Sequence, residues 1–154
     1  MSKEKPPLAP PCQGGSENDK GEWKYLKKPL LRSVLSPMEY HVTQEQGTEP
    51  KNSGKYLRVN ENGDYHCIVC DHMLFSTANQ YETQCGWPAF SKTSDDNAVV
   101  TAVDTTYGMI RTEVKCSNCS AHLGHVFEDG PKKYGGVRYC INSVALKLQC
   151  SKDE

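Results

Sequence analysis

Two cysteine pairs, each with two residues between its cysteines, constrain the fold of this chain more than any other feature. Cys67 and Cys70 form the first pair, Cys116 and Cys119 form the second, and residues 71–115 separate them. One pair on a tight turn presents two sulfurs on one side of a tetrahedron, and a second pair completes it. Four thiolates in this geometry select zinc, with an iron–sulfur centre as the alternative. We therefore expect a closed structural site for one Zn²⁺ per chain, with a whole subdomain inserted between the pairs.

The composition indicates a reducing compartment and argues against several classes of partner. The chain of 154 residues is about one domain long, and its net charge of −1 provides no strongly basic face for nucleic acid. No apolar run approaches the ~18 residues of a membrane span, and residues 1–20 lack the apolar region of a secretory signal. We expect a cytoplasmic monomer, or a protein of another reducing compartment, in which a disulfide scaffold is disfavoured.

The sequence divides into a polar tail, one domain and a short C-terminal tail. Residues 1–21, rich in Pro, Gly, Lys and Ser, are predicted to be disordered, whereas residues 22–149 form the domain and residues 150–154 lie beyond it. Residues 23–35 show helix-like apolar spacing, in which Pro29 should either interrupt the helix or start a turn.

A capping box opens a second predicted helix. Residues 36–39, with the sequence Ser-Pro-Met-Glu, place serine at the N-cap, proline at N1 and glutamate at N3. The helix should run to about Gln46 and stop at Gly47. Its expected buried face consists of Met38, His41 and Val42.

After Gly54 the sequence changes to short β-type runs separated by turn residues. The Asn-Gly pair within residues 60–64 predicts a hairpin between strands at 56–59 and 65–68. Strands this short, without intervening helices, favour antiparallel sheets and a mainly β fold. Further strands are expected at residues 73–76, 99–103, 109–114, 122–127, 137–141 and 145–148.

One of the remaining cysteines lies in a β-rich segment between an arginine and an asparagine. In an extended strand Arg138, Cys140 and Asn142 project from one face, while the residues between them pack behind. A thiol beside a fixed cation and an amide is a place where a reactive thiolate can form. The alternative is a buried, inert cysteine on a core strand, which is the commoner fate of a lone cysteine.

Two further segments supply an indole and two imidazoles. Cys85 and Trp87 lie in an irregular loop, where the indole is either a core anchor or an apolar wall for a small substrate group. His122 and His125 follow the second cysteine pair, and imidazoles can donate a proton near neutral pH. A second metal site at these histidines is the alternative.

Several motifs, taken together and in order, resemble those of the B-type methionine sulfoxide reductases over about residues 23–148. The resemblance implies two antiparallel β-sheets with the N-terminal helices packed outside, clamped by the zinc site. It also implies reduction of the R epimer of methionine sulfoxide, free or within proteins. Besides the two cysteine pairs, the motifs are Cys-Gly-Trp-Pro-Ala-Phe at 85–90, Gly-Met-Ile-Arg-Thr-Glu-Val at 108–114, Ala-His-Leu-Gly-His-Val-Phe at 121–127, Asp-Gly-Pro at 129–131 and Arg-Tyr-Cys-Ile-Asn-Ser at 138–143.

The same resemblance implies roles for single residues. Cys140 matches the catalytic nucleophile, Cys85 the recycling cysteine, and Trp87 the residue that packs against the methyl group of the substrate. Further catalytic positions are matched by His122, His125, Arg138 and Asn142, and further substrate-binding positions by Phe127 and Asp129.

The implied reaction begins when the Cys140 thiolate attacks the sulfoxide sulfur while His125, aided by His122, supplies a proton. Cys140 is left as a sulfenic acid, Cys85 condenses with it to a disulfide, and thioredoxin reduces that disulfide. Two alternatives stay open at this point. One is a zinc-ribbon interaction module in which Cys140 belongs to the core, and the other is a general thiol-redox carrier that needs only Cys85 and Cys140.

Overall fold

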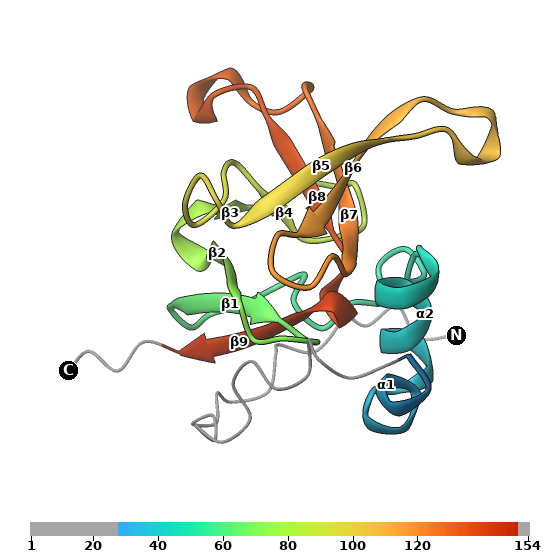
Figure 1. Ribbon diagram of the computed structural model, residues 1–154. Coiled ribbons are helices and arrows are strands. Elements are labelled where there is room, and N and C mark those ends of the chain that lie inside the picture. The colour runs from blue at the N-terminus through green and yellow to red at the C-terminus, as the bar shows by residue number, and fades with distance from the viewer. Residues whose placement is uncertain (1–27, 151–154) are drawn as a thin grey trace, which may run out of the picture.

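In the part of the chain that the structure describes, two antiparallel β-sheets have two α-helices beside them (Figure 1). The structure is a computed structural model and describes residues 28–150. The smaller sheet has the strand order β2-β1-β9, and the larger sheet has the order β3-β4-β8-β7-β6-β5. Every pairing is antiparallel, which confirms the prediction of a mainly β fold with two antiparallel sheets. The strands are Gly63–Cys67 (β1), Met73–Ser76 (β2), Gln80–Tyr81 (β3), Ala89–Phe90 (β4), Val99–Asp104 (β5), Arg111–Cys116 (β6), His122–Phe127 (β7), Arg138–Ile141 (β8) and Leu146–Cys150 (β9).

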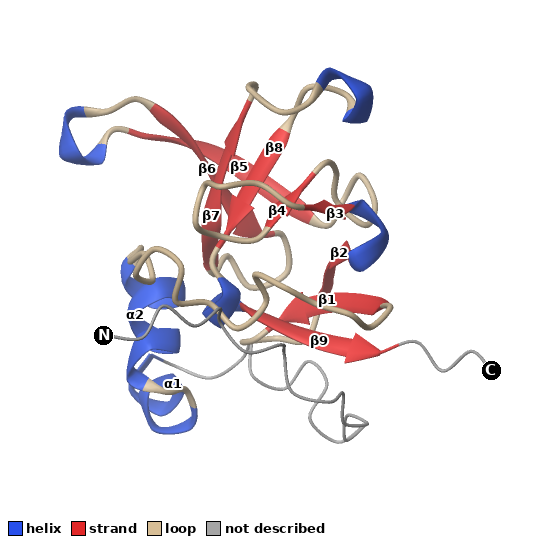
Figure 2. Cartoon of the chain, turned by 180° about the vertical axis from the view of Figure 1, so that it is seen from behind, coloured by secondary structure: helices blue, strands red, loops and turns tan. Residues whose placement is uncertain are grey.

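Both α-helices lie on one side of the molecule, outside the sheets, as Figure 2 shows from behind. The first, α1, spans Lys28–Val34 and includes Pro29, so this proline does not interrupt the helix; the prediction for residues 23–27 lies outside the described residues. The second, α2, spans Pro37–Glu45 and packs against β7 and the 3₁₀ turn Ser143–Ala145 (η6). In the described part of the chain, helices of 7 and 9 residues are the longest, far short of a bilayer span.

The capping box of α2 is confirmed. The backbone N–H of Glu39 donates to Ser36 Oγ at 3.1 Å, and that of Ser36 donates to Glu39 Oε1 at 2.9 Å. The helix ends when Gln46 takes a left-handed conformation, one residue before the predicted stop. This local reciprocal bonding explains why the helix starts where the sequence predicts.

The predicted buried face of α2 is confirmed for Val42 and wrong for Met38 and His41. Tyr40, Val42 and Thr43 are buried, whereas Met38 and His41 are exposed. Tyr40 turns inward beside α1, where the Arg32 guanidinium carbon lies 4.4 Å from its ring centroid. His41 instead meets Glu45 at the surface, with 3.0 Å between Nδ1 and Oε1. A short helix with polar residues on most sides leaves the choice of face to its neighbours.

The predicted hairpin between residues 56–59 and 65–68 is also wrong. Strand β1 pairs with β2 on one edge and with β9 on the other, so no edge is left for the residues that precede it. Tyr56 is buried in the core instead, and its hydroxyl accepts a hydrogen bond from Leu148 N at 3.1 Å. The Asn-Gly turn therefore leads into β1 from a loop.

The hydrophobic core lies between the sheets and contains rings from both. Tyr65 and Phe75 come from the smaller sheet and Phe90 from the larger one, and all three are fully buried. Phe75 stacks on Phe90 with 4.4 Å between centroids, and Tyr65 meets Phe90 edge-on at 5.3 Å. Because Ala89 in β4 pairs with Cys140 in β8, this packing also holds the strand that carries Cys140.

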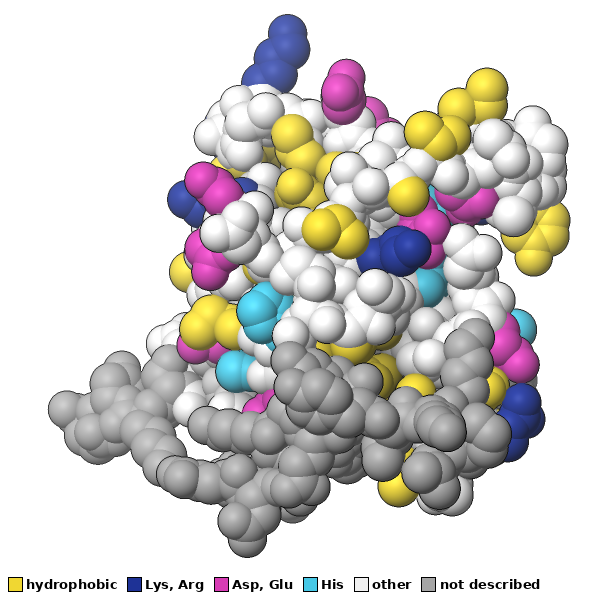
Figure 3. Space-filling view, viewed as in Figure 1, with side chains coloured by type: hydrophobic (Ala, Val, Ile, Leu, Met, Phe, Trp, Pro, Cys, Tyr) yellow, Lys and Arg dark blue, Asp and Glu magenta, His cyan; other side chains and the backbone are white. Residues whose placement is uncertain are grey.

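The hairpin of β5 and β6 extends beyond this core (Figure 1). Asp104 and Arg111 form its last strand pair, and residues 105–110 connect them. The connection exposes Tyr107 and Ile110, and Figure 3 shows hydrophobic side chains at the protruding end of the hairpin. In this last strand pair, Arg111 lines the cleft described below, and Asp104 bonds His125, another residue of its lining.

Candidate active site and metal centre

The two cysteine pairs adopt the same turn, one at the end of β1 and one at the end of β6. The carbonyl of Cys67 accepts a hydrogen bond from Asp71 N at 2.8 Å, and that of Cys116 accepts one from Ser120 N at 2.8 Å. Asp71 and Ser120 have φ values of 71° and 68°, so each turn closes through a left-handed residue. Two copies of one local geometry thus present two sulfurs each.

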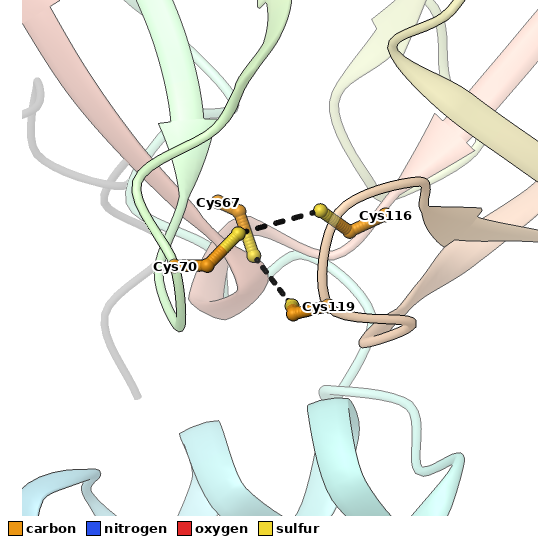
Figure 4. Close-up of side chains that lie close together, drawn as sticks. All are labelled: Cys67, Cys70, Cys116 and Cys119. Carbon is orange, nitrogen blue, oxygen red and sulfur yellow. Dashed lines mark hydrogen bonds between the residues drawn. The ribbon is translucent and has the colours of Figure 1, made fainter. Parts of the chain in front are cut away.

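The four sulfurs form a single cluster (Figure 4). All lie within 4.8 Å of one another, and the pairs Cys67–Cys119 and Cys70–Cys116 are each 3.6 Å apart. Metal–sulfur bonds of about 2.3 Å in a tetrahedron place the sulfurs roughly 3.8 Å apart, so the cluster fits an ion of that size. Backbone N–H groups donate to the sulfurs of Cys67 and Cys116 at 3.4 Å, which favours the thiolate form that binds metal.

This candidate metal site lies where the two sheets meet. Cys67 is the last residue of β1 in the smaller sheet, and Cys116 is the last residue of β6 in the larger one. A contact of 3.3 Å between His72 Nε2 and Ser117 Oγ adds a hydrogen bond between the two turns. None of the four cysteines lines the cleft described next, so the metal site and the remaining chemistry are separate.

A cleft of about 240 Å³ opens on the larger sheet. Cys140 in β8 lies directly opposite His125 in β7, and Arg138 lies opposite Phe127. Residues two apart in a strand share a face, so all four side chains project to the same side of the sheet. Gly124 allows the strands to meet, because a side chain there would overlap the backbone of Cys140. Thr48, Cys85, Trp87, Arg111, Gly124 and Asn142 complete the lining.

Cys85 reaches the cleft from the loop before β4, and its Sγ lies 3.7 Å from that of Cys140. Both thiols are free and half-buried. The hydrogen bond from the Cys140 thiol lowers the pKa of Cys85 to about 6, and the nearby Arg138 cation acts in the same direction. The pKa of Cys140 is raised by the same hydrogen bond and by burial, because a second thiolate would face the first. The two thiols therefore titrate as a coupled pair, and the first of their two protons is lost more readily than the proton of an isolated thiol.

Arg138 is held in place from two sides. Its Nε and Nη2 donate to the two carboxylate oxygens of Asp129 at 2.8 and 3.1 Å, and its guanidinium carbon lies 4.5 Å from the Phe127 ring centroid. The hydrogen bonds raise the pKa of Arg138 and lower that of Asp129. Asp129 does not line the cleft, and its side chain is 64% exposed. The structure therefore brings Asp129 to Arg138 and leaves it outside the cleft.

His125 is hydrogen-bonded to a carboxylate that the sequence analysis did not single out. Its Nε2 donates to Asp104 Oδ2 at 2.7 Å, and both side chains are buried. Asp104 Oδ1 accepts from Thr106 N and Oγ1 at 3.0 and 2.8 Å. The bond from His125 and the bonds from Thr106 hold the pKa of Asp104 well below its usual range. The ionised carboxylate therefore fixes the orientation of the imidazole.

His122 lies behind the cleft wall and does not line the cleft. Its Nδ1 donates to Glu113 Oε2 at 2.7 Å, and Gln46 Nε2 donates to the other oxygen of Glu113 at 2.9 Å. Burial lowers the pKa of His122, which favours the neutral ring. The ring centroids of His122 and His125 lie 5.4 Å apart in an edge-on arrangement, so the two imidazoles touch through their rings.

A buried loop residue, Glu49, holds two members of the cleft lining. Its carboxylate accepts hydrogen bonds from Ser143 N and Val144 N, both at 3.0 Å. Its backbone N–H donates to Asn142 Oδ1 at 2.8 Å, and its carbonyl accepts from Trp87 Nε1 at 3.0 Å. Burial raises the pKa of Glu49. These bonds orient the indole and the amide that line the cleft.

Four charged residues of this network were missed by the sequence analysis. Arg111 and Glu113 lie within the motif at 108–114, which offered a signal for them. Glu49 and Asp104 carry no local pattern, because each acts through a partner distant in sequence. The Glu49 carboxylate accepts a hydrogen bond from the backbone N–H of Ser143, which is 94 positions away in the sequence.

A reduced thiol pair in a partly aromatic cleft, apart from a closed four-cysteine cluster, defines the chain as a thiol-dependent oxidoreductase. Residues 35–150 match the model of the SelR domain. The chain belongs to this family, the B-type methionine sulfoxide reductases.

Curated relatives cover most of the chain. A peptide methionine sulfoxide reductase MsrB of Burkholderia pseudomallei (strain 1710b) is 47% identical over 123 residues, which are 80% of this chain and 86% of that protein. One of Pseudomonas syringae pv. syringae (strain B728a) is 48% identical over 127 residues, which are 82% and 90% of the two chains. A crystal structure of the Mis18 "Yippee-like" domain is similar with a TM-score of 0.48 and 13% identity, over 60% of this chain and 100% of that one, too distant to bear on function.

Proposed function

We propose that Cys140 is the nucleophile with which this protein reduces methionine-R-sulfoxide, in proteins or free, to methionine. The reaction itself is that of the family, so the protein is a peptide-methionine (R)-S-oxide reductase. The observation that carries the residue assignment is the 3.7 Å between the sulfurs of Cys140 and Cys85 at an aromatic cleft. An interaction module needs no such thiol pair, and a general thiol carrier needs no cleft.

The lining of the cleft matches the two parts of a sulfoxide group. Trp87 and Phe127 provide apolar surface for the methyl group, whereas Arg138, His125 and Asn142 provide polar groups for the oxygen side. A volume of about 240 Å³ suits one amino-acid side chain. The fixed indole and amide make the fit stereospecific, because three different substituents of the sulfur meet three different walls.

The first chemical step oxidises Cys140. Its proton first passes to the Cys85 thiolate 3.7 Å away, and the Cys140 thiolate so formed attacks the sulfoxide sulfur while an imidazolium at His125 protonates the oxygen. The carboxylate of Asp104 stabilises the charged ring. The oxygen passes to Cys140, which becomes a sulfenic acid, and methionine leaves with the two electrons. His122 supports this step by packing against the ring of His125.

The second step converts the sulfenic acid of Cys140 into a disulfide. Cys85 attacks the Cys140 sulfur, water leaves, and a bond of about 2.05 Å replaces the present separation of 3.7 Å. Rotation of the two cysteine side chains can bring the sulfurs together over this distance. Thioredoxin, a protein dithiol, then reduces the disulfide by exchange and returns both thiols.

The ion at the four-cysteine cluster is Zn²⁺ in this proposal, and its role is structural. Four thiolates in tetrahedral arrangement suit zinc, and four protein ligands leave no open position for a substrate. When bound, the ion ties the β1 turn to the β6 turn. Metal analysis of the purified protein distinguishes zinc from the iron–sulfur alternative.

We also propose that residues 22–149 form one domain that works as a cytoplasmic monomer. The family match over residues 35–150 and the single core between the sheets support one domain. The free thiol pair and the net charge of −1 suit a reducing, aqueous compartment. Size-exclusion chromatography with light scattering tests the monomer.

Turnover of separated sulfoxide epimers tests the function. With dithiothreitol as reductant, the wild type should reduce the R epimer and leave the S epimer, and Cys140→Ser should be inactive. The matched control is Cys85→Ser, which removes the neighbouring thiol and retains turnover with this reductant. Failure of the wild type to reduce the R epimer, or an active Cys140→Ser, would overturn the assignment.

A further inference from the structure

The end of the β5–β6 hairpin is an exposed apolar surface, and Figure 3 shows its hydrophobic side chains at the protruding end. Four large side chains form this surface, which we call the hairpin tip: Val103, Tyr107, Met109 and Ile110. Tyr107 is 87% exposed and Ile110 is 84% exposed, more than any other large hydrophobic residue in the described part of the chain. Residues 105–110, which connect the two strands, include no charged side chain. An exposed apolar surface of this kind is typical of a contact site for another molecule.

The conformation of Tyr107 is unfavourable for the stability of the hairpin. Its φ of 59° and ψ of 26° lie in the left-handed region, where a bulky side chain is disfavoured and glycine or asparagine is accepted. Within residues 28–150 the Tyr107 side chain makes no hydrogen bond or ring contact that would offset this cost. The exposed ring is therefore better explained by binding than by folding.

The hairpin tip is continuous with the cleft through printed hydrogen bonds of its first residues. Asp104 Oδ2 accepts a hydrogen bond from His125, which lines the cleft, while Asp104 Oδ1 accepts from Thr106 N and Oγ1. Nη2 of Arg111, another lining residue, donates to Thr106 Oγ1 at 3.5 Å. The residue before Tyr107 is thus bonded to the carboxylate that orients the imidazole, so the tip begins where the lining of the cleft ends.

Resting on the proposed function, we propose that the hairpin tip binds the apolar residues that flank an oxidised methionine in a polypeptide substrate. The sulfoxide side chain occupies the cleft, while a side chain two to four positions along the same extended peptide packs on Tyr107 and Ile110. The tip thus makes the sequence around the sulfoxide a determinant of specificity.

The reach of an extended peptide matches this arrangement. Tyr107 is four residues from Arg111 of the cleft lining, a distance of at most ~14 Å along the chain. An extended peptide covers the same span in about four residues, at ~3.3 Å each. A side chain two to four positions from a sulfoxide in the cleft therefore comes within reach of the tip, whereas the free amino acid has no such side chain.

The chemistry of methionine-containing segments matches it as well. Methionine is one of the residues most often buried in proteins, so it usually belongs to the apolar face of its strand or helix. Residues on the same face lie two positions away in a strand and three or four positions away in a helix. The positions that reach the hairpin tip are therefore those at which an oxidised methionine most often has apolar neighbours.

A second copy of the chain is the competing occupant. Away from the β5–β6 hairpin, exposed large hydrophobic residues of the described chain lie singly on separate elements: Val34 in α1, Met38 in α2, Met73 in β2 and Tyr134 in the 3₁₀ turn Lys132–Tyr134. Single exposed residues of this kind are normal on a protein surface. A second copy therefore offers the tip no comparable apolar surface except its own tip.

Three substrates and three variants test the proposal. The substrates are free methionine-R-sulfoxide and two nine-residue peptides with the sulfoxide at the centre, one with leucine and one with serine at the positions two to four residues away on both sides. Tyr107→Asn and Ile110→Ser alter the tip, and neither position lines the cleft. Val34→Asn removes an exposed apolar side chain from the end of α1 and is the matched control. All rates are measured with dithiothreitol.

We expect the wild type to have a kcat/KM at least fivefold higher for the leucine peptide than for the serine peptide. Tyr107→Asn and Ile110→Ser should lower kcat/KM for the leucine peptide by about three- to tenfold, mainly through KM. Turnover of the serine peptide and of the free amino acid should stay within twofold, and Val34→Asn should change none of the three. Because asparagine accepts the left-handed conformation, the thermal midpoint of Tyr107→Asn should equal or exceed that of the wild type.

The outcomes separate this proposal from the function on which it rests. Equal kcat/KM values of the wild type for the two peptides would overturn the proposal, as would tip variants that lose the same factor on all three substrates. Dimers in light scattering that both tip variants abolish would assign the tip to a second copy and overturn it too. A wild type that reduces none of the three substrates would instead refute the reductase function.

Discussion

Nε2 of His125 donates a hydrogen bond to Oδ2 of Asp104 across 2.7 Å, with both side chains buried. His125 in turn lies directly opposite Cys140 across the β7–β8 ladder. Asp104 comes from the last strand pair of the protruding β5–β6 hairpin, and its Oδ2 also lies 3.5 Å from Nη2 of Arg111, a lining residue of the cleft. We therefore expect the carboxylate to be a positioning residue, which acts on the substrate through the imidazole.

Replacing Asp104 with asparagine should lower kcat by roughly 10- to 100-fold, because the proton donor loses both its orientation and its anionic partner. The KM for the R epimer should stay within about threefold, since Asp104 does not line the cleft. Steady-state kinetics provide both values. Partial rescue by Asp104→Glu would support positioning by charge, whereas equal changes in kcat and KM would point to a collapsed cleft.

Replacing Cys85 with serine should separate chemistry from recycling. In the proposed mechanism Cys85, 3.7 Å away, is the resolving thiol, so without it the Cys140 sulfenic acid should persist. Turnover with dithiothreitol should continue, while turnover with thioredoxin should fall by at least an order of magnitude. A sulfenic-acid probe should label Cys85→Ser, but not the wild type, after one turnover. Equal thioredoxin-driven rates in the two proteins would remove Cys85 from the mechanism.

Removal of the metal should unfold the β region. A structural zinc site of this kind contributes on the order of 10 kcal/mol, comparable with the whole stability of a domain. Cys119→Ser, or a strong chelator, should therefore abolish the near-ultraviolet circular dichroism signal and release the metal. Cys85→Ser, which alters a thiol outside the cluster, is the matched control. A metal-free protein with wild-type fold and activity would contradict the structural role.

Glu49 should make the stability depend on pH. Burial raises its pKa in the folded state, so the charged form is disfavoured by folding. The contribution of Glu49 to the free energy of unfolding is fully present below its unfolded-state pKa of about 4.3. This contribution is lost as the pH rises through the raised pKa of the folded state. As the pH rises from 4 to 8, the unfolding free energy of the wild type should therefore decrease relative to that of Glu49→Gln. Urea unfolding at each pH measures it, and a constant difference would refute the prediction.

Truncation of the same side chain should cost stability at every pH. Glu49→Ala leaves the N–H groups of Ser143 and Val144 without their acceptors in a buried place. Each unsatisfied buried donor costs about 1–3 kcal/mol, so the unfolding free energy should fall by roughly 2–5 kcal/mol. The thermal midpoint should fall accordingly, and Glu49→Gln, which retains an acceptor oxygen, should lose less. Equal midpoints for all three proteins would show that water replaces these bonds.

Features encoded over a few residues were predictable. The capping box of α2 and the two cysteine turns each depend on a span of four or five residues. The strand assignments at β2, β5 and β7 followed from short runs of β-forming residues between turns. The projection of Arg138 and Cys140 to one side followed from the two-residue period of a strand.

Features that depend on distant partners were not predictable. The Asn-Gly turn before β1 favoured a hairpin, but β2 and β9 take both edges of that strand. The inward face of α2 depends on α1, β7 and η6. No sequence pattern near Glu49 predicts that its carboxylate accepts hydrogen bonds from the backbone N–H groups of residues 143 and 144.

The sequence by itself thus determined the chemistry that is available: four cysteines with metal-binding spacing, a strand thiol between a cation and an amide, a loop thiol beside an indole, and two imidazoles. Only the tertiary structure decided which groups meet. It brings Cys85 to Cys140, gives each imidazole its own carboxylate, and leaves Asp129 outside the cleft. The reason is physical: spacing determines geometry within a turn or a strand, whereas the choice among distant partners depends on which strand edges pair and which side chains the common core can bury.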